Sequence, residues 1–277
     1  MTCDLHLHSV YSDGLRTPEE LCALAVREVI QLIALSDHDT TAGLPPFEEA
    51  ARACNLRQSG VLTVVPAIEL STGAGGRVHV LGYGVTGELP ELQGVLAVQR
   101  ERRRKRGARM LEKLRALGVD LPPSPIPFGR AEVARALMAA GVVNTLTQAF
   151  DRYLGEGKPG YVPLEHLSTG EAIALLHRSG ALPVLAHPAR SGLTGPALES
   201  LLLEWRQRGL RGLEVYHLSA SRTQRPELDA LARRLGLLVT GGSDYHGDAG
   251  THAALGRLPA WPRQGEDCQL FLSALRG

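Results

Sequence analysis

The amino-acid sequence predicts an α/β fold in which a parallel sheet closes into a barrel and a helical insertion interrupts the chain. Short apolar segments alternate with amphipathic helices, which is the pattern of a parallel sheet covered on both faces. This unit recurs about seven times, and that number favours a closed barrel over a doubly wound open sheet. No glycine-rich phosphate loop follows any expected strand, which weakens the open-sheet alternative further.

The composition argues against several classes of function. The 277 residues carry a net charge of only +1, so no global field recruits nucleic acid or an anionic membrane. An aromatic content of 4% argues against a surface that stacks many bases. The cysteines lack CxxC spacing, which disfavours a disulfide framework and a thiolate zinc site. Without a leader pattern or an apolar run of about 18 residues, we expect a soluble, cytoplasmic protein that does not bind membranes.

The first 85 residues contain four expected strands. The opening strand carries His6 and His8, and apolar runs follow at residues 32–35, 61–65 and 78–81. Thr17 and Glu20 predict a capping box at the start of the helix between the first two strands. Another helix is expected around residues 46–54.

We expect residues 86–163 to form the helical insertion, between barrel residues 1–85 and 164–277. A charged segment from residue 99 begins a long helix, and the proline-rich segment 121–127 is a rigid, non-helical linker. Two shorter helices are expected at residues 130–140 and 144–154. The barrel pattern then resumes, with helices and strands expected in the order 168–177, 182–185, 197–207, 213–216, 226–235 and 237–240.

Residues that can bind metals lie at or just beyond the carboxyl ends of these strands. His6 and His8 are two apart on one strand, so both imidazoles face the same side. The later strand ends add Asp37, His38, Asp39, Glu69, His187, Asp244 and His246. In a parallel barrel these ends form one face, and buried groups so close together need pairing or a bound cation. A multinuclear site for zinc, manganese or iron is therefore favoured over purely structural roles. It indicates a metal hydrolase more firmly than a phosphoesterase, because amide hydrolysis uses similar ligands.

These motifs resemble those of the polymerase-and-histidinol-phosphatase (PHP) domain family, in the right order along nearly the whole chain. They are His6-Leu7-His8-Ser9 with Ser12-Asp13-Gly14, Ser36-Asp37-His38-Asp39, Glu69, His187-Pro188 and Gly242-Ser243-Asp244-Tyr245-His246-Gly247. The resemblance implies a distorted (β/α)7 TIM-like barrel. It also implies a centre of two to three divalent metal ions.

The resemblance further implies which residues hold each ion. One ion would take His6, His8, Glu69 and Asp244, a second Glu69, His79 and His187, and a third Asp13, His38 and His246. His79 lies within a strand, so a core histidine is the alternative there. We expect Asp37 and Glu214 to orient ligands from behind, and His187, His246 and Asp244 to act in catalysis. His217 is expected to be a solvated loop histidine.

Basic residues of the insertion indicate which class of substrate the protein binds. Arg103 and Arg106 lie three apart on one helix face, and Arg130 and Lys158 lie next to or near glycines. A solvated charged face is the alternative for the arginine run. With residues 149–159, these positions resemble the branch that includes 3′,5′-nucleoside bisphosphate phosphatases and enzymes that trim short RNAs from the 5′ end. In that branch the insertion caps the barrel, and its basic residues hold a second phosphate.

The resemblance therefore implies hydrolysis of the 3′-phosphate of nucleoside 3′,5′-bisphosphates by a metal-activated hydroxide. Short 5′-phosphorylated oligonucleotides are further expected substrates, and no protein partner is evident. One departure is Ala131-Glu132, where the branch often has Pro-His after Gly-Arg; an acidic residue here would weaken phosphate or ribose binding unless it points to solvent. Histidinol phosphate or another small phosphomonoester is the alternative substrate. A non-catalytic PHP binding module is the alternative of a different class, against which the intact motifs argue.

Overall fold

The structure is a computed structural model, and it describes residues 1–57, 62–73, 76–85, 89–121, 129–247 and 254–276. The chain forms two compact units. The first comprises Met1–Gln93 and Leu167–Gly277, and the second comprises Gly94–His166. Of the expected proline-rich linker at residues 121–127, all but Leu121 lies outside the described residues.

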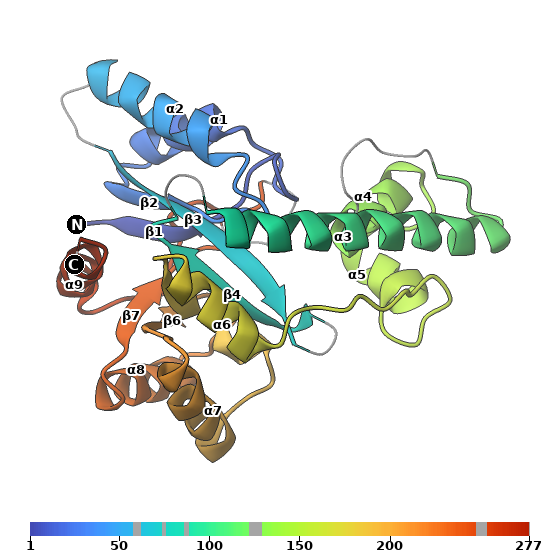
Figure 1. The fold of residues 1–277 in the computed structure, drawn as a ribbon. Helices are drawn as coiled ribbons and strands as arrows, with labels where there is room; N and C mark the ends of the chain where they lie inside the picture. Colours follow the sequence, from blue (N-terminus) through green and yellow to red (C-terminus); the bar gives the residue numbers. More distant parts are fainter. Residues whose placement is uncertain (58–61, 74–75, 86–88, 122–128, 248–253, 277) are drawn as a thin grey trace. The chain divides into compact units, whose positions relative to one another are not determined.

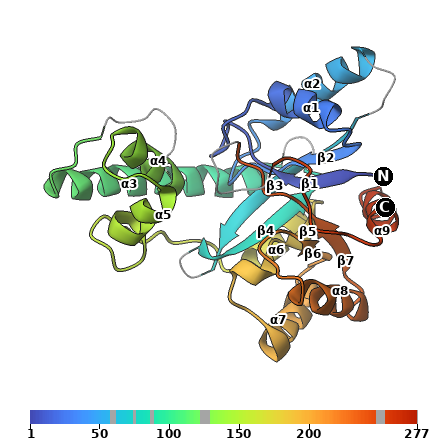
Figure 2. The same cartoon turned by 180° about the vertical axis from the view of Figure 1, so that it is seen from behind.

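The first unit is built on a seven-stranded sheet in which strands adjacent in sequence are adjacent in space (Figure 1, and from behind in Figure 2). A parallel bridge between Leu7 and Tyr245 joins the first strand to the segment after the last one. The sheet is thus a nearly closed barrel, which confirms the predicted fold class. Its strands are β1 (Cys3–Leu7), β2 (Leu32–Leu35), β3 (Thr63–Thr72), β4 (Val78–Tyr83), β5 (Leu182–Leu185), β6 (Gly212–Tyr216) and β7 (Leu238–Gly241).

One strand departs from the predicted parallel arrangement. β4 pairs antiparallel with both β3 and β5, so the expectation of an all-parallel sheet is wrong at this strand. The reason is the connection between β3 and β4: residues 73–77 are too few for a parallel crossover, which needs about a dozen residues, but enough for a hairpin. The start of β4, which carries His79, therefore lies at the edge where the parallel strands end.

β3 is longer than the sequence predicted. It pairs in parallel with β2 from Thr63 to Pro66 and continues beside β4 to Thr72. Glu69 therefore lies inside this strand, and its expected place at the strand end is wrong. Because β3 extends beyond the end of β2, Glu69 still reaches the edge occupied by His38, with which it forms an isolated bridge.

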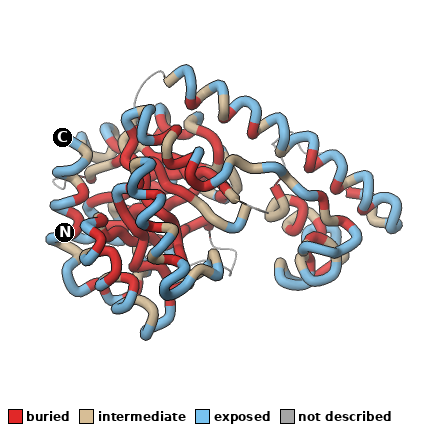
Figure 3. The backbone as a smooth tube through the Cα atoms, turned by 60° about the horizontal axis from the view of Figure 1, so that its bottom comes forward, coloured by how far each residue is buried: buried red, intermediate tan, exposed pale blue. Residues whose placement is uncertain are grey.

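Helices surround the barrel of the first unit (Figure 1). They are α1 (Pro18–Arg27), α2 (Leu44–Arg57), α6 (Thr169–Arg178), α7 (Gly195–Gln207), α8 (Gln224–Arg234) and α9 (Gln264–Ala274). The capping box predicted for Thr17 and Glu20 is present, and Ser168 forms another with Glu171. The sequence did not reveal α9, because its apolar residues show little helical periodicity. Every residue of β1, β2, β5 and β6 is buried, as expected for covered parallel strands. Figure 3 shows buried residues along the chain in red.

The second unit is helical and has its own apolar core. It contains most of α3 (Pro90–Ala116), with α4 (Arg130–Ala139), α5 (Leu146–Ala149) and the π-helical turn Phe150–Leu154. α3 begins at Pro90, earlier than the expected residue 99. The buried core side chains are Met110, Leu114, Leu121, Val133, Ala134, Leu137, Val143, Ala149, Leu154 and Val162. No helix of the described ranges is long and apolar enough to cross a membrane.

A buried carboxylate fastens α9 to the barrel. Asp267 is 2% exposed and accepts hydrogen bonds from Trp261 Nε1 at 2.8 Å and from both Nη atoms of Arg233 at 3.0 and 2.9 Å. Trp261 in turn stacks on Tyr216 of β6, with ring centroids 4.9 Å apart. One side chain thus ties α9 to α8 and, through the tryptophan, to the sheet.

Replacing Asp267 with Ala should lower the free energy of unfolding by about 3 kcal/mol, because the buried Trp261 N–H and the partly buried Arg233 guanidinium lose a charged acceptor. The matched control is Glu266→Ala, since Glu266 is exposed and pairs with Arg263 at the surface. The control should lose less than about 1 kcal/mol. Urea denaturation of both variants measures the difference, and equal losses would contradict the role of Asp267.

Candidate metal centre

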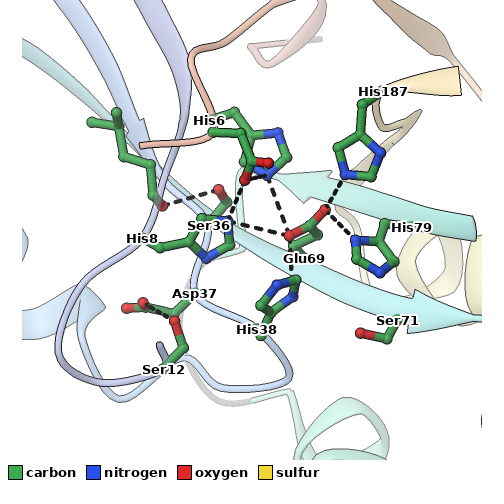
Figure 4. A network of polar contacts seen from close by, with 12 residues as sticks. His6, His8, Ser12, Ser36, Asp37, His38, Glu69, Ser71, His79 and His187 are labelled. Atoms are coloured by element: carbon green, nitrogen blue, oxygen red, sulfur yellow. Dashed lines mark hydrogen bonds and ion pairs between the residues drawn. The ribbon is translucent and has the colours of Figure 1, made fainter. Parts of the chain in front are cut away.

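Three ring nitrogens approach a single oxygen atom of Glu69. The Glu69 side chain is completely buried, and its Oε2 lies 3.2 Å from His6 Nε2, 3.2 Å from His8 Nε2 and 3.1 Å from His38 Nδ1 (Figure 4). His6 lies on β1, with His8 directly beyond its end, and His38 follows β2. Because β1, β2 and β3 are adjacent in the sheet, their ends bring these side chains together.

None of these four atoms forms a hydrogen bond with any residue that the structure describes. A buried polar atom left without such a bond costs about 1–3 kcal/mol, so four at one place require another partner. A divalent cation satisfies all four together, because imidazole nitrogens and carboxylate oxygens are ligands of zinc, manganese and iron. The residues present therefore fit a metal centre.

The other oxygen of Glu69 faces two further histidines. Oε1 lies 2.8 Å from His79 Nδ1 and 3.0 Å from His187 Nε2. His187 lies two residues after the end of β5, and His79 lies near the start of the antiparallel strand β4. The reversed direction of β4 explains how a residue within a strand reaches the same edge as residues that follow strands.

Two aspartates add carboxylates to the cluster. Asp244 Oδ1 lies 3.2 Å from His8 Nε2 and 3.5 Å from His6 Nε2. Asp13 Oδ1 lies 3.2 Å from His246 Nε2 and 3.8 Å from His8 Nδ1. The Nδ1–H of His246 donates to the backbone carbonyl of Asp244 at 2.8 Å, which turns Nε2 toward Asp13.

These side chains form three overlapping groups, each with ligand atoms within 4.8 Å of one another. The groups are His6, His8, Glu69 and Asp244; His8, Asp13, His38 and His246; and His38, Glu69 and His79. The first has the membership that the resemblance implied. The second contains His8 in addition to the expected residues, and the third has His38 where His187 was expected. Because the groups share members, the cluster is able to hold more than one cation.

Asp37 forms hydrogen bonds with the loop that carries Asp13. Its carboxylate accepts hydrogen bonds from the Ser9 backbone N–H at 2.7 Å and from the Ser9 hydroxyl at 2.6 Å. It also accepts a hydrogen bond from the Ser12 hydroxyl at 2.6 Å (Figure 4). No described contact joins Asp37 to an imidazole. Its part in the site is therefore to order the loop between His8 and Asp13, and not to orient a ring directly.

Glu214 supports two histidines from behind. Its side chain is fully buried on β6, and Oε1 lies 3.0 Å from His6 Nδ1. Oε2 accepts the backbone N–H of His187 at 2.7 Å. A carboxylate on Nδ1 fixes the ring so that Nε2 faces Glu69, which is the usual support of a metal-bound histidine.

Two residues at the centre were missed by sequence reasoning. His217 is 2% exposed, so the expectation of a solvated loop histidine is wrong. Arg190 donates from Nη1 to Asp244 Oδ2 at 2.6 Å. Both residues closely follow strand ends, β6 and β5 respectively, and that position was the signal that would have found them.

Burial and charge set the protonation of the centre. Burial lowers the pKa of His187 to about 4, only partly offset by Glu69, so the ring is neutral near pH 7 and able to bind metal. Burial alone would raise the pKa of the Glu69 carboxyl, but the imidazoles, with His38 first, outweigh it and hold it well below its usual range. Burial lowers the pKa of the His8 imidazole, but the carboxylates of Asp244 and Glu69 more than offset this and raise it to about 10. A cation among these carboxylates would compete with that proton.

Three arginines gather in the second unit. Arg106 is 7% exposed, and its Nε donates to the Val162 carbonyl at 2.8 Å. Burial, reinforced by the charges of Arg130 and Arg103, lowers the pKa of Arg106 to about 10. Arg103 lies near Gly129, the residue before α4, where no side chain caps the helix. Positive charges at a helix start favour an anion.

Glu132 lies close to this arginine cluster, whereas Lys158 is exposed and makes no described contact with it. The Glu132 side chain is only 17% exposed, with Oε1 3.8 Å from Arg135 Nη2, and it lies beside Gly129 at the same helix start. It therefore does not simply point to solvent, and its charge offsets part of that of the arginines. Lys158 is exposed, and no described contact joins it to Arg103, Arg106 or Arg130.

Known proteins with similar sequences act on phosphoric esters. The chain is 36% identical over 251 residues to the 5′-3′ exoribonuclease Rnm of Salmonella typhimurium, covering 88% of this chain and 84% of that protein. It is 34% identical over 252 residues to the 3′,5′-nucleoside bisphosphate phosphatase of Chromobacterium violaceum, covering 88% and 86%. It is 32% identical over 272 residues to the phosphoribosyl 1,2-cyclic phosphate 1,2-diphosphodiesterase of Eggerthella lenta, covering 93% and 99%.

A solved structure that resembles this chain also belongs to a phosphoesterase. A crystal structure from Bifidobacterium adolescentis, assigned as a metal-dependent phosphoesterase, matches with a TM-score of 0.84 at 30% identity, covering 98% of this chain and 95% of that chain. The PHP domain model matches residues 4–98, which include His6, His8, Glu69 and His79. Together with the metal-binding geometry, these similarities establish that the chain belongs to the PHP domain family and is a metal-dependent phosphoric ester hydrolase.

Proposed function

We propose that the protein is a phosphatase that releases the 3′-phosphate from nucleoside 3′,5′-bisphosphates. The observation that carries this proposal is the cluster of Arg103, Arg106 and Arg130. A guanidinium buried beside two like charges is costly unless an anion binds there, and a bisphosphate supplies a second anion that a monophosphate lacks. The relative from Chromobacterium violaceum is named for this activity.

The proposed metal ligands are the members of the three groups together with His187: His6, His8, Asp13, His38, Glu69, His79, His187, Asp244 and His246. Glu69 would contribute to two ions, since its two oxygens face different histidines. Bound manganese, zinc or iron would lower the pKa of a water molecule and neutralise phosphoryl oxygens.

His187, His246 and Asp244 are the proposed catalytic residues. His187 and Asp244 adopt left-handed backbone conformations, with φ of 24° and 55°, and such strain persists mainly at functional sites. The neutral ring of His187 has no acidic proton to give up, so its remaining N–H would donate a hydrogen bond to the departing ribose oxygen. The hydrogen bond from the His246 ring to the backbone carbonyl of Asp244 fixes the orientation of that ring relative to the Asp244 backbone.

The substrate's 5′-phosphate would be bound by the arginine cluster. Arginine presents a planar fork of donors that matches phosphate oxygens, and Lys158 would add a point charge on a flexible stem. Glu132 would moderate this binding, because its carboxylate lies at the same helix start.

Trimming of short 5′-phosphorylated RNA is a second candidate function. It is favoured by the relatives named as 5′-3′ exoribonucleases. Histidinol phosphate lacks a second phosphate, and the arginine cluster argues against it.

Replacing Glu69 with Gln should remove at least one bound ion per chain, because a carboxylate shared by two sets of histidines loses its charge. Phosphatase activity should fall by about 1,000-fold or more. Plasma mass spectrometry of the purified variant measures the metal. Glu204→Gln, a change at an exposed residue paired with Arg208, is the control. Wild-type metal content in the Glu69→Gln variant would contradict the assignment.

Replacing Arg103 or Arg130 with Ala should raise KM for adenosine 3′,5′-bisphosphate by about 10- to 100-fold, the effect of losing a charge-assisted hydrogen bond. KM for adenosine 3′-monophosphate should hardly change, because that substrate lacks the 5′-phosphate. Arg109→Ala, at an exposed position of α3, is the control. The proposal fails if both substrates are affected equally, or if neither is.

Replacing Glu132 with Gln should lower KM for the same bisphosphate by about 2- to 10-fold, because a negative charge next to the phosphate site disappears. Steady-state kinetics with bisphosphate and monophosphate in parallel measure the effect. A higher KM would mean that Glu132 aids binding, contrary to this account.

A further inference from the structure

Two donors outside the PHP motifs meet at one oxygen of Asp244. Arg190 Nη1 donates to Oδ2 at 2.6 Å, and His217 Nε2 lies 3.7 Å from the same atom. Arg190 belongs to the 3₁₀ turn after β5, and His217 follows β6. The other oxygen, Oδ1, faces His6 and His8. Asp244 thus has proposed metal ligands on one side and two donors on the other.

The hydrogen bonds of His217 determine which ring nitrogen carries the proton. The backbone N–H of Ser219 donates to His217 Nδ1 at 3.0 Å, so Nδ1 is an acceptor and a neutral ring has its hydrogen on Nε2. The His217 side chain is 3% exposed, and Nε2 has no hydrogen-bond partner among the described residues. Asp244 Oδ2, at 3.7 Å, is too far for a good hydrogen bond, so a ligand oxygen bound beside it would satisfy this buried N–H.

Arg190 is suited to reach the same acceptor. Its side chain is 41% exposed, whereas the Asp244 carboxylate that it contacts is 2% exposed. A guanidinium has several N–H donors in a planar fork, and among the described residues Arg190 donates to one side chain, that of Asp244. The remaining donors are therefore available to a bound anion next to the metal centre.

We propose that Arg190 and His217 bind a non-bridging oxygen of the phosphoryl group that is hydrolysed, with Asp244 holding the two donors together. This inference rests on the proposed phosphatase function and assigns it two substrate-binding residues. A phosphoryl group presents several oxygens, and charge-assisted bonds from Arg190 and a fixed N–H from His217 would stabilise an oxygen on the side of Asp244 away from the proposed metal ligands. The competing role is structural, in which both donors only orient Asp244 for metal binding.

The test uses the full chain loaded with Mn²⁺ and inorganic phosphate as the probe. Arg190→Gln should weaken phosphate binding by about 10- to 100-fold, and His217→Leu by about tenfold, both with unchanged metal content. His217→Gln should retain most of the affinity, because the amide places an N–H near the position of Nε2. Isothermal titration calorimetry measures phosphate, and plasma mass spectrometry measures manganese. Arg234→Gln is the matched control, since Arg234 is an exposed arginine of α8 that pairs with Glu199.

Unchanged phosphate affinity in both Arg190→Gln and His217→Leu would overturn the inference. So would a loss of manganese that parallels the loss of phosphate, since that result identifies the structural role. A failure of the proposed function is distinguishable, because it would appear as a wild-type protein that hydrolyses no nucleoside bisphosphate. The phosphate affinities of the variants can be compared whether or not the wild-type protein hydrolyses a nucleoside bisphosphate.

Discussion

A buried carboxylate faced by five imidazoles is the constraint on which the rest of the site depends. The oxygens of Glu69 are approached by ring nitrogens of His6, His8, His38, His79 and His187, and several of these atoms have no hydrogen-bond partner among the described residues. In water each group would be solvated, but inside the barrel they need a shared cation. These side chains come from β1, β3 and β4 and from segments that follow β1, β2 and β5, so they meet only if these strands reach one edge of one sheet. The barrel provides that edge.

The hairpin of β3 and β4 is what distinguishes this barrel from an all-parallel one, and it contributes directly to the centre. Glu69 pairs with Leu81 across the hairpin, so His79, two residues before Leu81, lies diagonally opposite on the same face. Carboxylates behind the site then limit the freedom of its parts. Glu214 holds the His6 ring, and Asp37 holds the loop before Asp13. Rigid support of this kind keeps ligands in place before a cation binds.

Much of this arrangement was predictable, because residues that follow parallel strands converge whatever their distance in sequence. His6, His8 and His38 illustrate the rule. The direction of β4 and the length of β3 were not predictable from apolar runs, since a run reports burial and not orientation. Arg190 and His217 were not predicted as site residues, because neither belongs to a motif and a lone loop histidine is usually solvated. Their proposed role depends on contacts with Asp244, which lies 54 residues after Arg190 and 27 residues after His217 in the chain. Only the folded structure brings these residues together.

The central claim is that Glu69 and its surrounding histidines hold metal ions. It is tested most directly by a crystal structure of the protein grown with Mn²⁺, with anomalous differences recorded at the manganese edge. The account predicts at least two peaks among the three groups of side chains, with Glu69 in contact with two of them. Manganese bound elsewhere in an active crystal, with no peak at Glu69, would contradict it.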